Sequence, residues 1–151
     1  MEPLESFSID FIGWFYTLGC ALVIAAGGAI FAFLYVSGRL ATRYKDYSIL
    51  NDVMLMVIWL IGLVGAIGVL DRSQWGLFLL QLFCWMLIAL VSTSGATRLY
   101  TLKKLHKGLS RRDWTHSLVG VVLVVLPIVL FCLGTIMSLR TDEVRAAFGF
   151  R

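Results

Sequence analysis

Charge is almost absent from four long stretches of this 151-residue sequence, and that absence excludes several kinds of membrane chemistry. The stretches cover residues 12–36, 53–70, 75–96 and 118–139, and no Asp, Glu, Lys, Arg or His lies well inside any of them. Proton and ion pumps keep ionisable groups at depth, because those groups carry the moving charge. The sequence therefore argues against a pump mechanism within this chain.

Histidine and cysteine are also scarce, which weakens the case for a cofactor or a metal. Haem b between membrane helices needs histidines on facing helices, whereas His106 and His116 both lie at the edge of the apolar stretches. Cys20, Cys84 and Cys132 show no C-x-x-C spacing, so we interpret them as small buried apolar side chains. The polar segments contain no nucleophile with a base, no phosphate-binding glycine loop and no paired carboxylates. We expect no catalytic residue, no metal site and no cofactor.

Hydrophobic residues make up 60% of the chain and charged residues only 15%, which is too few to cover a water-soluble globule. Each apolar stretch reaches or approaches the ~20 residues that a helix needs to cross a bilayer. Residues 1–10 carry no base, so we interpret the first stretch as a retained helix and not as a secretory signal. The predicted fold is an all-α, integral membrane bundle of four transmembrane helices, with residues 1–151 as one membrane domain.

The distribution of Lys and Arg predicts the orientation of this bundle. Nine of the thirteen follow the first or the third stretch. Cytoplasmic loops retain positive charge, so both connections are expected in the cytoplasm and both termini on the periplasmic side of a bacterial inner membrane.

Short polar segments predict how the helices begin and join. Only residues 71–74 separate the second and third stretches, which predicts an antiparallel hairpin. Asn51 and Asp52 are expected to cap the second helix, and Thr141 is expected to start a short helix near the end of the chain. Leucines at helical spacing up to Leu109 predict that the third helix continues beyond the membrane.

Small residues recur in the first two stretches, where they allow helices to approach closely in lipid. These small residues either pack helices of the same chain together or form the contact surface between chains of an oligomer. The set comprises Ala21, Ala25, Gly28, Ala29, Gly62, Gly65 and Ala66.

The connection 97–113 has a net charge of plus five and is the strongest functional candidate. Topology alone accounts for such a loop, but it also suits anionic lipid or an acidic cytosolic protein. It lacks the interleaved aromatic residues of nucleic-acid platforms, so no nucleic-acid partner is expected. Its basic residues are Arg98, Lys103, Lys104, Lys107, Arg111 and Arg112.

The leading hypothesis is a non-catalytic inner-membrane subunit or scaffold that assembles with itself or with other membrane chains. Its partners would be membrane lipids, other subunits and a cytosolic protein at the basic loop. One alternative is a small homo-oligomeric channel or transporter; another is an immunity or defence membrane protein. The residues that would line a channel are Thr17, Gln81, Ser92 and Ser94.

Overall fold

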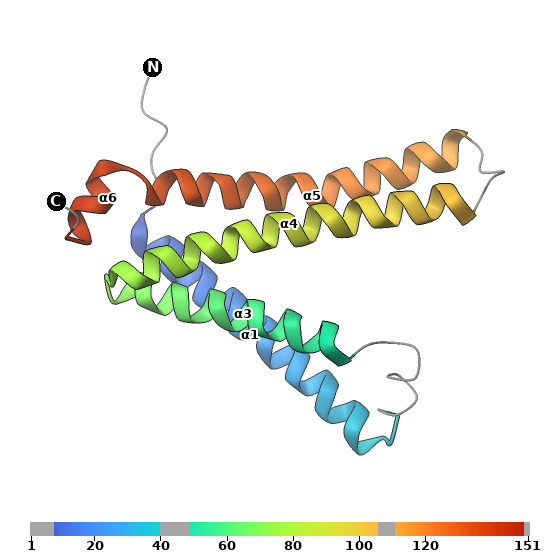
Figure 1. The fold of residues 1–151 in the computed structure, drawn as a ribbon, viewed down its shortest axis with the longest axis horizontal. Coiled ribbons are helices and arrows are strands. Elements are labelled where there is room, and N and C mark those ends of the chain that lie inside the picture. Colours follow the sequence, from blue (N-terminus) through green and yellow to red (C-terminus); the bar gives the residue numbers. More distant parts are fainter. Residues whose placement is uncertain (1–7, 40–48, 106–110, 150–151) are drawn as a thin grey trace. The chain divides into compact units, whose positions relative to one another are not determined.

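The computed structural model describes residues 8–39, 49–105 and 111–149, and within these ranges all regular structure is helical (Figure 1). Four helices are long and a fifth is short. In chain order they are α1 (Ile9–Val36), α3 (Ile49–Leu70), α4 (Gln74–Leu105), α5 (Arg111–Leu139) and α6 (Asp142–Ala147).

The four long helices are long and apolar enough to cross a membrane, as the sequence predicts. Their bounds differ from the prediction at polar ends. Helix α3 begins at Ile49, so the expectation that Asn51 and Asp52 cap it is wrong: both lie inside its first turn. Helix α4 continues to Leu105, in agreement with the leucine spacing, and α5 begins at Arg111, ahead of the apolar stretch 118–139. The described residues of the basic connection 97–113 are therefore helical.

The chain divides into two compact units. The first comprises residues 1–83 and 138–151, and the second comprises residues 84–137. The first unit thus holds α1, α3, the beginning of α4, the end of α5 and α6, while the second holds the rest of α4 and α5.

In the first unit, a turn of three residues joins α3 to α4. The backbone N–H of Ser73 donates to the carbonyl oxygen of Gly68 at 2.8 Å, and that of Arg72 donates to Val69 at 3.1 Å. This pair of bonds is a Schellman ending, in which the residue after the cap adopts a left-handed conformation. That residue is Arg72, with a φ of 53°, where glycine is the usual choice.

Glycines at three-residue spacing allow α3 and α4 to approach closely. A Cβ atom added at Gly62 would lie 2.7 Å from the Phe83 ring, one at Gly65 would lie 2.7 Å from the Leu80 backbone nitrogen, and one at Gly68 would lie 2.6 Å from the Gly76 Cα atom. The hairpin predicted from residues 71–74 is thus a close contact of backbones.

Helix α1 packs against α3 near its own beginning. Gly13 lies against the Leu70 side chain, and Tyr16 meets the Phe83 ring edge to face at a centroid distance of 6.0 Å. Phe83 is fully buried and also contacts Trp59 of α3, at 5.5 Å. One aromatic side chain of α4 therefore joins all three helices of this core.

Helix α6 completes the first unit. It begins after Thr141, as predicted, although the Thr141 side chain makes no capping bond. Val144 and Phe148 are buried, and the Gln74 side-chain amide donates to the Phe148 carbonyl oxygen at 3.2 Å. A hydrogen bond thus joins the residue that follows α6 to the start of α4.

In the second unit, α4 and α5 pack at Gly95. A Cβ atom added there would lie 3.1 Å from Val121 and 3.2 Å from Val125. Cys84, Cys132 and Thr135 are buried.

Candidate functional site

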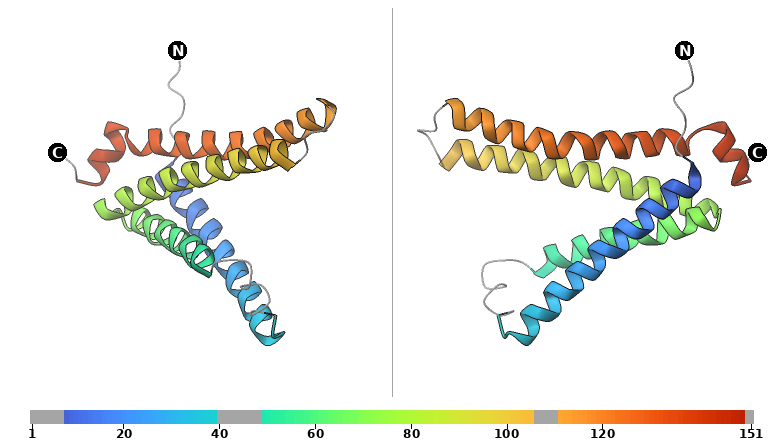
Figure 2. Two further views of the ribbon diagram at one scale, coloured as in Figure 1. Left: turned by 45° about the vertical axis from the view of Figure 1, so that its right-hand side comes forward. Right: turned by 180° about the vertical axis from the view of Figure 1, so that it is seen from behind.

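Helices α1 and α3 run antiparallel and enclose a groove toward one end. Gly13 faces Leu70 at the packed end, and Gly27 faces Met56 farther along, where an added Cβ atom would lie 3.3 Å from the Met56 Cε atom. Beyond Cys20, no residue of α1 is buried. The two helices separate toward the end of α1 and the beginning of α3 (Figure 2).

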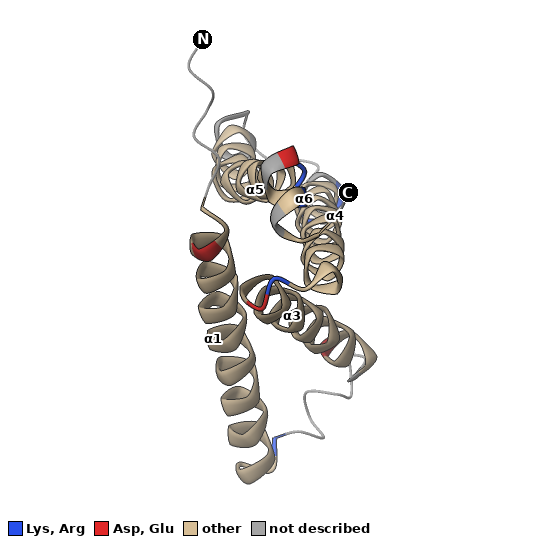
Figure 3. Cartoon of the chain, turned by 90° about the vertical axis from the view of Figure 1, so that its left-hand side faces the viewer, with Lys and Arg blue, Asp and Glu red and all other residues tan. Residues whose placement is uncertain are grey.

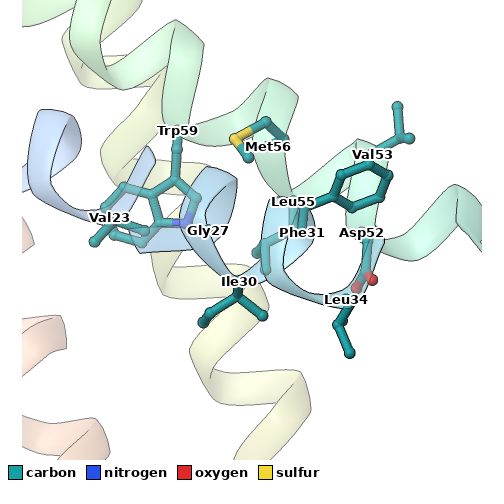
Figure 4. Close-up of a pocket in the computed structure, with 10 residues that line it drawn as sticks. All are labelled: Val23, Gly27, Ile30, Phe31, Leu34, Asp52, Val53, Leu55, Met56 and Trp59. Atoms are coloured by element: carbon teal, nitrogen blue, oxygen red, sulfur yellow. The ribbon is translucent and has the colours of Figure 1, made fainter. Parts of the chain in front are cut away.

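The groove has a volume of about 390 Å³, within the range of ~300–1,000 Å³ that is usual for ligand sites. Nine of its ten lining residues are uncharged, and the tenth is Asp52, in the first turn of α3. Trp59 and Val23 lie at the inner end of the groove, whereas Asp52 and Leu34 lie at the other end (Figure 4). The remaining lining residues are Gly27, Ile30, Phe31, Val53, Leu55 and Met56.

The sequence did not predict this groove. Asp52, which was predicted to cap α3, lies at the outer end of the groove. The sequence does not show where α1 diverges from α3. Val and Ile occur both on helix surfaces that face lipid and in the walls of an apolar groove, so their positions do not distinguish the two.

The small residues of α1 lie on the opposite side from α3. Successive residues of a helix are about 100° apart, so Ala21, Ala25, Gly28 and Ala29 occupy a single face about 100° wide. The residues that pack on α3 or line the groove cluster on the other side. All four small residues are exposed, and an added Cβ atom at Gly28 would meet nothing within 4 Å. We call this set the α1 small-residue face.

The small residues of α3 instead lie inside the first unit. Gly62 and Gly65 contact α4, and Ala66 is fully buried. The seven small residues of the predicted set therefore serve two surfaces, one inside the chain and one outside it.

The basic residues are described only in part. Arg98 and Lys104 are exposed on α4. Lys103, Arg111 and Arg112 belong to helices, but their side chains lie outside the described residues, as does the whole of Lys107. On the four long helices, Lys, Arg, Asp and Glu lie toward the ends, which leaves the middle of each of these helices uncharged (Figure 3).

The residues proposed to line a channel are divided between the two units. Thr17 and Gln81, both half-buried, belong to the first unit, whereas Ser92 and Ser94 are exposed in the second. The Thr17 hydroxyl is buried without a hydrogen-bond partner in the described part of the chain.

Ser94 lies in a shallow hollow with Arg98 and three threonines of α4. Two of these threonines, Thr93 and Thr97, donate their hydroxyls to carbonyl oxygens of Ala89 and Thr93 in their own helix, each at 2.7 Å. Such bonds give a hydroxyl a partner without water. The hollow therefore does not by itself indicate an aqueous path.

Among the described residues, no three His, Cys, Asp or Glu side chains come together in a way that would hold a metal ion. Cys20 lies in the first unit and Cys84 and Cys132 in the second, and none of the three forms a disulfide. Comparisons with known protein families, with curated proteins and with solved structures give no significant match. The function must therefore be argued from the two surfaces of α1 and from the charges at the helix ends.

Proposed function

We propose that the protein inserts into a membrane through α1, α3, α4 and α5 and serves as a non-catalytic subunit of a membrane complex. Its α1 small-residue face binds a transmembrane helix of another chain or of a second copy. The single observation that carries this function is the exposure of that face on the side of α1 directed away from α3.

The physical reason lies in how helices associate in lipid. Leucine gains little by contact with another helix instead of an acyl chain, whereas small residues let two backbones approach and pack. The four-residue spacing of Ala21, Ala25 and Ala29 places three small side chains in one row. Within the first unit, the glycines of α3 already show such an approach toward α4.

The orientation belongs to this proposal. The basic ends of α4 and α5 lie in the cytoplasm and both termini in the periplasm of a bacterial inner membrane, by the positive-inside rule. Exposed Arg98 and Lys104 then lie where anionic lipid or an acidic cytosolic protein can reach them.

The test is native mass spectrometry of the gently solubilised, tagged protein and of two variants. Gly28→Leu places a large side chain on the α1 small-residue face. Gly19→Leu is the matched control, because Gly19 also meets nothing within 4 Å and lies nine residues away, about half a turn around the helix.

We expect the wild type and Gly19→Leu to retain a second copy or a partner chain. Gly28→Leu should weaken that association at least ~10-fold, equivalent to ~1.4 kcal/mol. A monomeric wild type without partners, or equal association in both variants, would refute the assignment of this face.

A further inference from the structure

The length of the uncharged part of α4 shows which residues reach the headgroup layer of a membrane. At 1.5 Å per residue, the stretch from Trp75 to Ser94 covers about 30 Å, the thickness of the hydrocarbon core. This stretch contains no charged residue, and Arg98 is the first one after it. Arg98 lies about 6 Å beyond Ser94 along the helix, which is the depth of the polar layer on that side.

Helix α5 gives the same boundary independently. Counted back from the last residue of α5, about 30 Å of helix ends at Gly120. The neighbours of Gly120 and Ser94 are in contact across the two helices, because a Cβ atom added at Gly95 would lie 3.1 Å from Val121. Helices α4 and α5 lie side by side here (Figure 1), so both leave the hydrocarbon core at one level.

A row of polar side chains begins on α4 at this level. Ser94, Arg98 and Thr101 lie on one face of the helix, at four-residue and three-residue steps, and all three are exposed and line the shallow hollow. A long helical side chain covers the turn before its own Cα atom, so Arg98 covers the surface beside Ser94. The Thr93 and Thr97 hydroxyls donate to carbonyl oxygens of their own helix, so Ser94 and Thr101 supply the hydroxyls that flank the guanidinium. We call Ser94, Arg98 and Thr101 the Arg98 row.

The charge around the Arg98 row favours an anionic partner. Residues 97–113 contain six bases and one acid, Asp113, so a single carboxylate faces a large excess of positive charge. A guanidinium presents its N–H donors in a fork that matches two oxygens of a phosphate. At headgroup depth that phosphate belongs to a phospholipid, and the excess of bases favours a lipid with net negative charge.

We propose that the Arg98 row binds the phosphate of an anionic phospholipid. The Arg98 guanidinium pairs with the phosphate, the Ser94 and Thr101 hydroxyls donate to it, and an acyl chain runs along α4 past Leu90, which lines the same hollow one turn deeper. The proposal rests on the membrane insertion proposed above. It does not rest on assembly, because the Arg98 row belongs to the second unit and the α1 small-residue face to the first.

The test places the full-length protein in phosphatidylcholine nanodiscs with a minor fraction of phosphatidylglycerol that carries the same acyl chains. Native mass spectrometry measures the amount of each lipid that remains bound. Arg98→Gln removes the guanidinium, Arg98→Lys keeps the charge without the fork, and Ser94→Ala removes one hydroxyl. Arg39→Gln is the matched control, because Arg39 is an exposed arginine outside the hollow, on the same side of the membrane in the proposed orientation.

The wild type should retain phosphatidylglycerol about 10-fold above its share of the nanodisc lipid. Arg98→Gln should abolish this enrichment, a loss of ~10-fold or ~1.4 kcal/mol, as expected for hydrogen bonds to a charged group. Arg98→Lys and Ser94→Ala should each weaken binding about 3-fold, as for one neutral hydrogen bond. Arg39→Gln should retain the lipid as the wild type does.

No enrichment in the wild type, or undiminished enrichment in Arg98→Gln, would overturn the site. An equal loss in Arg39→Gln would assign the enrichment to overall charge, and full binding by Arg98→Lys would overturn the role of the fork. Soluble polyglutamate should leave the lipid in place; its displacement of the lipid would assign the Arg98 row to an acidic protein instead. Failure of the wild type to enter nanodiscs would overturn the proposed membrane insertion, which separates that failure from the others.

Discussion

Replacing Gly65 by alanine should separate α3 from α4, although the change adds one methyl group. The new Cβ atom would lie 2.7 Å from the Leu80 backbone nitrogen and 3.0 Å from the Leu79 carbonyl carbon. Ordinary contacts of a Cβ atom begin near 3.4 Å, so the helices must move apart by about 0.7 Å. Backbone atoms cannot rotate away as a flexible side chain can.

The magnitude follows from two opposing terms. Overpacking costs ~1–3 kcal/mol, and contact with backbone places Gly65→Ala at the upper end of that range. Alanine in place of a helical glycine contributes up to ~1 kcal/mol of stability. We therefore expect the free energy of unfolding to fall by ~2 kcal/mol.

The assay is reversible unfolding of the purified protein in mixed micelles, followed by circular dichroism. Gly19→Ala is the control, because it gains the same helix preference and its Cβ atom meets nothing within 4 Å. The two variants should differ by ~3 kcal/mol. If Gly65→Ala were as stable as Gly19→Ala, the close approach of α3 and α4 at Leu80 would be refuted.

Two further substitutions test single residues of the first unit by the same unfolding measurement. Arg72→Gly should raise the free energy of unfolding by ~1 kcal/mol, because Arg72 has a left-handed φ of 53° that glycine adopts without strain; a lower stability would contradict the Schellman ending. Thr17→Val should stabilise the protein by ~1 kcal/mol, because it removes a buried hydroxyl without a partner in the described residues; a loss of stability would show that this hydroxyl is bonded in the membrane.

The helices themselves were predictable from the sequence because a helix that crosses a bilayer needs a characteristic length of uncharged, apolar residues. A run of about 20 apolar residues has few structures available in a bilayer other than a helix, and the four runs are helices here. The ends were harder to predict. A polar pair such as Asn51 and Asp52 occurs both at a helix N-cap and within the first turn of a helix. Ile49 and Leu50 precede this pair, and the apolar pattern alone does not show whether they belong to the helix or to the loop before it.

The partition of the small residues could not be predicted for a related reason. Gly65 and Gly28 look equivalent in the sequence, since each belongs to a spaced set in an apolar helix. The three-residue turn at Arg72 forces α4 onto α3, so Gly65 becomes an internal contact. The connection from α1 to α3 is longer, with residues 37–48, and Gly28 stays open.

The neighbouring glycines Gly27 and Gly28 separate the two surfaces of α1. They lie about 100° apart, one against Met56 in the groove and the other on the open face. If the two surfaces act independently, Gly27→Leu disturbs the packing of α1 on α3 but keeps the partner, and Gly28→Leu does the reverse. If either variant did both, the packing of α1 on α3 would be required for α1 to present its small-residue face, and the two surfaces would be coupled through the position of this one helix.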